Sequence, residues 1–122
     1  MPKKKIFPQR IVLCLCACMG MLAFLVIYGP APLDPTADTW LLAGYDEGDI
    51  TQHYAGWLAF RNSPWAFPLG YAANLSVPDG VIISYTDSIP WVAILCKLLR
   101  GVLPDTWQYF GLYTLLCFVL QG

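Results

Sequence analysis

The sequence predicts an all-α, polytopic membrane protein with about three transmembrane helices and a long external loop containing short amphipathic helices. Of the 122 residues, 57% are hydrophobic and only 12% are charged, about half the charged fraction of an average soluble domain. The apolar residues gather in three long runs, and the basic residues flank these runs while most acidic residues lie between the first two. We therefore expect the lipid bilayer to be a partner of the chain. The net charge of −1 gives no reason to expect nucleic acid.

The first apolar run, 11–28, has no charged residue and follows a basic N-terminus, 1–10. As a helix it would be about 27 Å long, close to the hydrocarbon thickness of a bilayer, and it predicts a first transmembrane helix. A cleaved signal peptide is the alternative interpretation, although signal cores usually contain only about 7–15 residues. Three prolines follow and should end the helix: Pro30, Pro32 and Pro35.

The distribution of charge predicts the topology. Basic residues favour the cytoplasmic side of a membrane, and they occur before the first run and at Lys97 and Arg100. The region 29–81 contains Arg61 as its one basic residue among many acidic ones. We therefore place the N-terminus in the cytoplasm and the loop 29–81 outside.

The remaining apolar segments predict two further spans. The segment 82–99 contains Pro90, which suits the first turn of a helix, and Lys97 could extend toward the cytoplasmic headgroups. A cytoplasmic turn, 100–105, then leads to a third span, 106–122. Because this last run has no flanking charge and no Gly/Pro exit, we expect the chain to be the N-terminal part of a longer protein.

The external loop contains the candidate functional residues. Three carboxylates lie within 46–49, immediately before a segment with helical periodicity. Its apolar stripe (Ile50, Tyr54, Trp57 and Leu58) suits packing on a membrane or on neighbouring spans. A second face carries Asp49, Gln52 and His53.

Structural roles are open for each of these residues. Asp49 could serve only as a helix N-cap, His53 as an interfacial hydrogen-bonding group, and Arg61 as the partner of an acid or of a lipid phosphate. All five cysteines lie in apolar runs, and a lone histidine is poor evidence for a metal, so no metal ligands are predicted. The candidates are Asp49 and Asp46 for catalysis, and His53, Gln52, Arg61 and Trp57 for substrate binding.

Five stretches carry a family resemblance: 48–57 (GDITQHYAGW), 60–65 (FRNSPW), 67–70 (FPLG), 85–90 (YTDSIP) and 108–112 (QYFGL). They resemble an uncharacterised bacterial multi-pass membrane family that is similar in architecture to GT-C glycosyltransferases. The resemblance implies an enzyme of the bacterial inner (plasma) membrane that transfers sugar from a polyprenyl-phosphate donor at the outer face.

By this resemblance Asp49 would act as the base, with Asp46 as the next candidate, and Arg61 or His53 would neutralise the departing phosphate. A divalent metal is a cofactor that such enzymes can use, and the part alone is expected to be inactive. The competing hypothesis is a small, non-catalytic membrane anchor or assembly subunit. A transporter is a third, with Asp87 and Lys97 as its candidate intramembrane charges.

Overall fold

The computed structural model describes residues 8–43 and 48–122. The chain is mostly helical, with one two-stranded sheet among the described residues. It divides into two compact units. We call residues 8–35 with 110–122 the helix-pair unit, and residues 36–109 the intervening unit.

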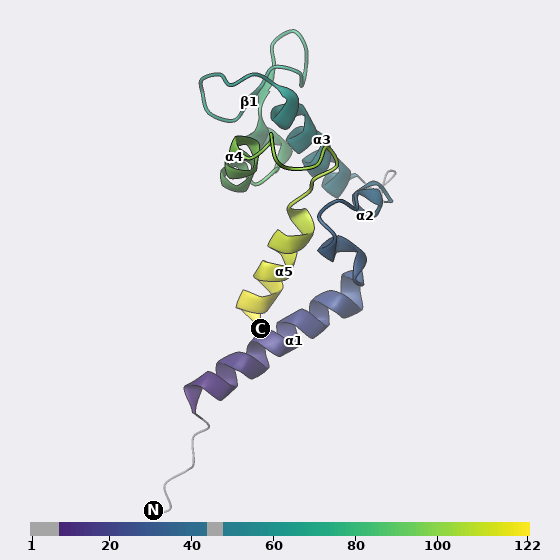
Figure 1. Ribbon diagram of the computed structural model, residues 1–122, viewed down its shortest axis with the longest axis vertical. Helices are drawn as coiled ribbons and strands as arrows, with labels where there is room; N and C mark the ends of the chain where they lie inside the picture. The colour runs from purple at the N-terminus through teal and green to yellow at the C-terminus, as the bar shows by residue number, and fades with distance from the viewer. Residues whose placement is uncertain (1–7, 44–47) are drawn as a thin grey trace, which may run out of the picture. The chain divides into compact units, whose positions relative to one another are not determined.

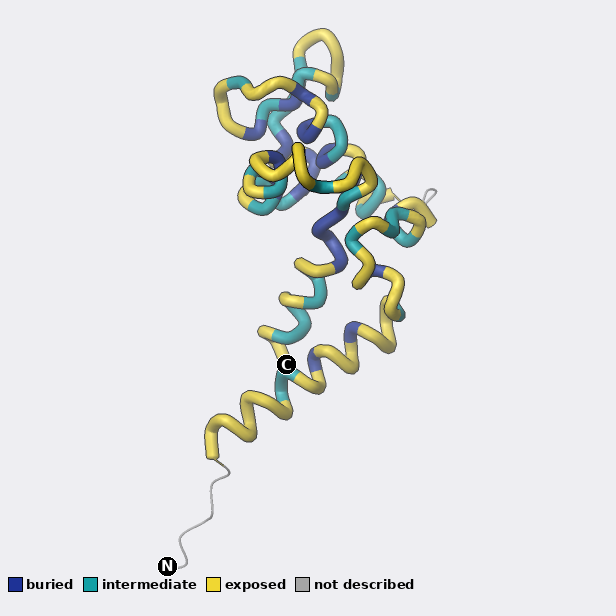
Figure 2. Tube along the Cα trace, in the orientation of Figure 1, coloured by how far each residue is buried: buried dark blue, intermediate teal, exposed yellow. Residues whose placement is uncertain are grey.

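The helix-pair unit consists of α1 (Gln9–Tyr28), the short 3-10 helix η1 (Ala31–Leu33) and α5 (Phe110–Gln121). Helix α1 follows Pro8 and ends at Gly29, whose φ of 69° few other residues adopt. Of its 20 residues only Gly20 and Phe24 are buried, and Figure 2 shows the helix exposed along nearly all its length. Its apolar side chains therefore face outward.

Helices α1 and α5 approach closely through glycine. A Cβ on Gly20 would collide with the main-chain oxygen of Phe118, and a Cβ on Gly111 would collide with that of Pro32. The Phe24 and Phe118 rings meet edge to face, with centroids 5.9 Å apart. In Figure 1 the end of α5 lies against the middle of α1. Small residues at a helix contact are typical of membrane helix pairs.

One helix among the described residues is long and apolar enough to cross a membrane, whereas the sequence predicted three spans. That helix is α1, with a mean hydropathy of 2.7 and a length of about 30 Å. The predicted span 82–99 instead contains α4 (Pro90–Leu98), nine residues long or about 14 Å. Helix α5 has 12 residues, about 18 Å. The second span is shortened because Asp87 and Ile89 adopt left-handed φ values of 50° and 49°, which helix geometry does not allow.

The intervening unit is built around α3 (Asp49–Asn62). Around it lie α2 (Thr39–Leu42), β1 (Tyr71–Ala72), β2 (Val81–Ile82), η2 (Ile83–Thr86) and α4. The two strands pair antiparallel, with Tyr71 opposite Ile82 and Ala72 opposite Val81. Figure 1 shows α4 and β1 beside α3.

The core of the intervening unit is formed by the apolar face of α3. Tyr54, Trp57 and Phe60 are almost fully buried, together with Ile83 and Ala93. Of the predicted stripe on α3, Tyr54 and Trp57 therefore pack inside this unit rather than on a membrane, whereas Ile50 and Leu58 are half-buried. Periodicity identified an apolar face correctly, but it could not tell a protein core from lipid.

Candidate functional site

Asp49 is the first residue of α3 and is exposed. Gly48, with a φ of 67°, occupies the N-cap position, and the structure has no side-chain cap there. The N-cap interpretation of Asp49 was therefore wrong. Within 8–43 and 48–122 the Asp49 carboxylate has no hydrogen bond or ion pair. A negative charge in the first turn is favourable because it faces the positive end of the helix dipole. Asp46, the other catalytic candidate, lies outside the described residues.

His53 lies one turn after Asp49 on the same face of α3. Its Nδ1 is 2.7 Å from the carbonyl oxygen of Thr86. Because a carbonyl can only accept, Nδ1 carries the proton and Nε2 is the nitrogen left for other chemistry. Gln52 is exposed on the same turn. The first two turns of α3 thus present a carboxylate, an amide and an oriented imidazole together, as the sequence predicted.

A polar cluster that sequence reasoning missed fixes the turn that holds His53. The hydroxyl oxygens of Thr86 and Ser88 are 2.6 Å apart, and the Ser88 hydroxyl donates to the main-chain oxygen of His53 at 2.7 Å. The Tyr109 hydroxyl donates to the carbonyl of Ser88. Gly56 permits this approach, since a Cβ there would overlap both hydroxyls.

The backbone on either side of Ser88 is strained. Asp87 and Ile89 have positive φ, and for a β-branched residue this conformation costs about 1–3 kcal/mol. The hydrogen-bonded cluster offsets that cost and locks the turn against α3. The one sequence feature that could have indicated this cluster was the polar run before Pro90, within the stretch that carries the family resemblance.

Arg61 is buried and has a structural role. Its Nη1 donates to the carbonyls of Pro104, at 2.5 Å, and Asp105, at 3.3 Å. Its Nη2 donates to those of Leu103, at 2.8 Å, and Arg100, at 3.4 Å. The carboxylate of Asp105 is 3.9 Å away and fully exposed, so this ion pair adds little. The guanidinium holds the turn after α4, which does not support a role in phosphate binding.

Trp57 also belongs to the core. It is fully buried, its Nε1 donates to the carbonyl of Trp107 at 2.8 Å, and its ring meets that of Tyr109 with centroids 5.2 Å apart. A substrate could not reach it without opening the unit. The structure therefore does not support substrate binding by Trp57.

Lys97 is buried, whereas the sequence predicted that it extends toward headgroups. Its Nζ lies 3.8 Å from the ring centroid of Phe60 and 4.6 Å from that of Trp65, and 3.4 Å from the carbonyl of Pro64. Burial, and then the charge of Arg100, lower its pKa to about 8. The two rings offset part of the cost of burying the ammonium group.

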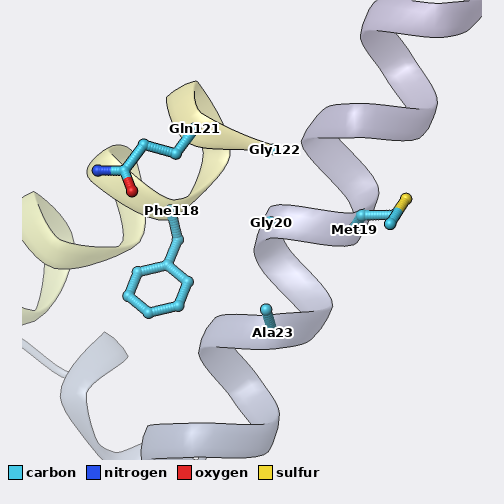
Figure 3. Close-up of a pocket in the computed structure, with 6 residues that line it drawn as sticks. All are labelled: Met19, Gly20, Ala23, Phe118, Gln121 and Gly122. Carbon is cyan, nitrogen blue, oxygen red and sulfur yellow. The ribbon is translucent and has the colours of Figure 1, made fainter.

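No metal centre is evident in the described part of the chain, where no three His, Cys, Asp or Glu residues lie close enough to hold an ion. A cavity of about 260 Å³ lies between α1 and α5 (Figure 3). No residue that lines it can act as an acid, base or nucleophile, so we assign it no chemistry: Met19, Gly20, Ala23, Phe118, Gln121 and Gly122.

These observations define a mostly helical protein with one candidate membrane span among its described residues and an intervening unit that presents Asp49 and His53. Comparison with protein families identifies a domain of unknown function (DUF6311) over residues 17–122. The chain belongs to this family. Neither a curated protein nor a solved structure matched it.

Proposed function

We propose that this chain is a membrane-bound part of a GT-C-like glycosyltransferase of the bacterial plasma membrane. In this proposal α1 crosses the membrane with its N-terminus in the cytoplasm, and the intervening unit faces the outer side. The donor is a sugar linked to polyprenyl phosphate. The observation that carries the proposal is the exposed Asp49 carboxylate, one turn from the oriented ring of His53 on a firmly held helix.

The surface of α1 supports the membrane assignment. Its exposed side chains are predominantly large and apolar, and such a continuous surface would be costly in water. In hydrocarbon the cost disappears, and the helix satisfies its own backbone hydrogen bonds. The Gly20 contact with α5 is of the kind that membrane helices use.

The geometry of α3 suits a transfer that needs one base and one phosphate-binding group. As an acceptor hydroxyl oxygen bonds to the sugar's anomeric carbon, the bond from that carbon to the phosphate oxygen breaks and Asp49 takes the hydroxyl proton. Nε2 of His53, when protonated, can donate to the departing phosphate. In this proposal Gln52, which is exposed on the same turn, binds sugar hydroxyls, and Asp46 is the second candidate base.

The test is Asp49→Asn in the complete protein, assayed in membranes by transfer of labelled sugar from a panel of polyprenyl-phosphate donors. Loss of the base should lower the rate at least about 100-fold. Asp79→Asn is the matched control because Asp79 is also an exposed carboxylate of the intervening unit, and it should keep full activity. Normal transfer by the Asp49→Asn protein would rule out the base role.

A non-catalytic anchor or assembly subunit is the second candidate. The observation that favours it is that two of the predicted substrate-binding residues, Arg61 and Trp57, are committed to holding the core. Such a protein should tolerate substitution of both Asp46 and Asp49 in any growth or assembly assay. An enzyme should lose function with at least one of them.

A further inference from the structure

The outward side of α4 and the turn after it form an apolar face. Five large side chains there are between 57% and 87% exposed: Trp91, Leu95, Leu98, Leu99 and Val102. Trp91, Leu95 and Leu98 are spaced i, i+4 and i+7, so they share one side of the helix. We call these five residues the α4 face.

The orientation of the α4 face is fixed by the opposite side of the helix. Ala93 and Lys97 are almost fully buried, and Lys97 is held between the rings of Phe60 and Trp65. Rotating α4 to hide its apolar face would draw the lysine out of these contacts. The face therefore needs a partner outside the intervening unit.

The charges around the α4 face suit a lipid headgroup layer. The segment 88–104 contains no acidic residue, and its basic residue at the surface is Arg100. Arg100 is exposed, and its Nη1 is held at the surface by the carbonyls of Arg61 and Ser63. A tryptophan and an arginine bordering leucines are typical of helices that lie at a membrane interface.

The connections of the unit keep it near the bilayer in which α1 lies. Residues 29–35 separate α1 from the intervening unit, and seven residues span at most about 25 Å even when fully extended. At the other end Tyr109 directly precedes the apolar helix α5. Because the chain is tethered in this way, the bilayer surface stays close to the intervening unit, and binding to it is favoured by a high effective concentration.

We propose that the α4 face binds the surface of the membrane that α1 spans. Its apolar side chains enter the interface by about 5–10 Å, and Arg100 contacts lipid phosphate. The inference rests on the membrane assignment in the proposed function, but not on catalysis by Asp49. A second copy of the chain or another protein segment would be a different occupant of the same face.

The test uses the full chain in nanodiscs of phosphatidylethanolamine and phosphatidylglycerol, with the five native cysteines replaced by alanine. A spin label is attached at Leu95→Cys, at Ser84→Cys as an exposed polar-site control, and at Leu22→Cys on the exposed side of α1. Collision with oxygen reports lipid, and collision with a water-soluble nickel chelate reports solvent. We expect the oxygen-to-nickel ratio at Leu95 to be several-fold above that at Ser84 and below that at Leu22.

Two results at Leu95 would overturn the inference. Nickel access equal to that at Ser84 would place the face in water, and shielding from both reagents would show that protein covers it. The label at Leu22 separates this failure from that of the proposed function. If Leu22 is also in water, the membrane assignment itself fails, whereas lipid at Leu22 with water at Leu95 rejects the α4 face alone.

A charge on the face provides an independent variant that should leave the fold intact. Leu98 and Ser84 are both exposed, so Leu98→Glu and Ser84→Glu should be equally well folded. Leu98→Glu should raise nickel access at Leu95 several-fold, and Ser84→Glu should leave it unchanged. An unchanged value with Leu98→Glu would contradict membrane binding.

Discussion

The two units of this chain place their residue types in opposite ways. In the helix-pair unit, α1 turns large apolar side chains outward and buries little besides Gly20 and Phe24. In the intervening unit, charged and polar side chains are buried with the aromatic ones: Arg61, Ser63, Thr86, Ser88, Lys97 and Gln108. This difference fits the proposal that α1 lies in lipid while the intervening unit lies in water and at the interface.

The units also differ in what holds them together. Under the proposed membrane assignment, hydrophobic burial would contribute little to the packing of α1 on α5, and the close contact at Gly20 would matter most. The intervening unit instead depends on hydrogen bonds between buried side chains and main-chain carbonyls, which are costly to leave unmade. Substitutions in the two units should therefore differ in how much stability they remove and in which contacts they break.

The largest effect should follow Arg61→Ala. Removing the guanidinium leaves the carbonyls of the turn after α4 without their donors, which should lower the free energy of unfolding of the intervening unit by about 3–5 kcal/mol. Denaturant titration in nanodiscs, followed by tryptophan fluorescence, would measure it. Arg10→Ala is the control, since Arg10 is exposed on α1. An equal effect of both substitutions would contradict the structural role of Arg61.

The next effect should follow Gly56→Ala. The added Cβ would overlap the hydroxyls of Thr86 and Ser88, so the cluster that orients His53 must open, at a cost of about 2 kcal/mol. Gly101→Ala is the matched control because nothing lies within 4 Å of its Cβ position. Denaturation of the two variants under the same conditions would measure the loss of stability. A Gly56→Ala protein as stable as the control would show that the turn can shift to make room for the added Cβ.

Sequence reasoning succeeded where the information was local. It predicted a helix over 11–28, which the structure confirms as Gln9–Tyr28. It also predicted a helical segment directly after the carboxylates of 46–49, where α3 lies, and Pro90 in the first turn of another helix. The shared face of Asp49, Gln52 and His53 follows from helical spacing alone. Proline, capping and periodicity fix such features without tertiary contacts.

It failed where contacts distant in sequence decide the outcome. Arg61 bonds to carbonyls about 40 residues away along the chain, and His53 is oriented by a carbonyl 33 residues away. Lys97 was expected near headgroups because an apolar run around a lysine looks alike in lipid and in a core. An apolar surface suited to a membrane was expected on α3, but the structure buries Tyr54 and Trp57 there and exposes large apolar side chains on α4.

In the helix-pair unit, Gly20→Ala should loosen the contact between α1 and α5. The main-chain oxygen of Phe118 cannot move aside as a side chain can, so the helices should separate at a cost of about 1–2 kcal/mol. Spin-label distances between Met19→Cys and Leu116→Cys, in a background without other cysteines, should broaden. Leu22→Ile, on the exposed side of α1, should leave them sharp. Equal distance distributions in the Gly20→Ala and wild-type proteins would show that the contact between α1 and α5 does not need glycine.

A smaller effect should appear as a pH dependence of the intervening unit. The pKa of Lys97 is lowered from 10.5 to about 8, so the unfolded chain holds this proton more strongly than the folded one. Stability should therefore rise with pH above 8, by about 1 kcal/mol up to pH 9. Well below pH 8 the lysine is charged in both states and contributes no slope.

Lys97→Met is the control for this pH dependence, since the difference between the two proteins cancels the other titrating groups. Burial raises the pKa of Cys96 and of Tyr109, and burial followed by the charge of Asp38 raises that of Tyr54 to about 12. These groups lower stability above about pH 9, which limits the useful window. Urea titrations at pH 7, 8 and 9 should show the slope in the wild type only. A slope that persists in Lys97→Met would assign it to another group.

The smallest effect on stability should come from Asp49→Asn. The carboxylate is exposed and has no hydrogen bond or ion pair within the described ranges 8–43 and 48–122, so its loss removes only a favourable charge at the start of α3, about 0.3 kcal/mol. Arg61→Ala should shift the denaturation curve of the unit strongly, whereas Asp49→Asn should leave it almost unchanged. A large loss of sugar transfer in a protein of unchanged stability would then reflect chemistry at Asp49. Loss of stability comparable to that of Gly56→Ala would instead assign Asp49 to the structure of the unit.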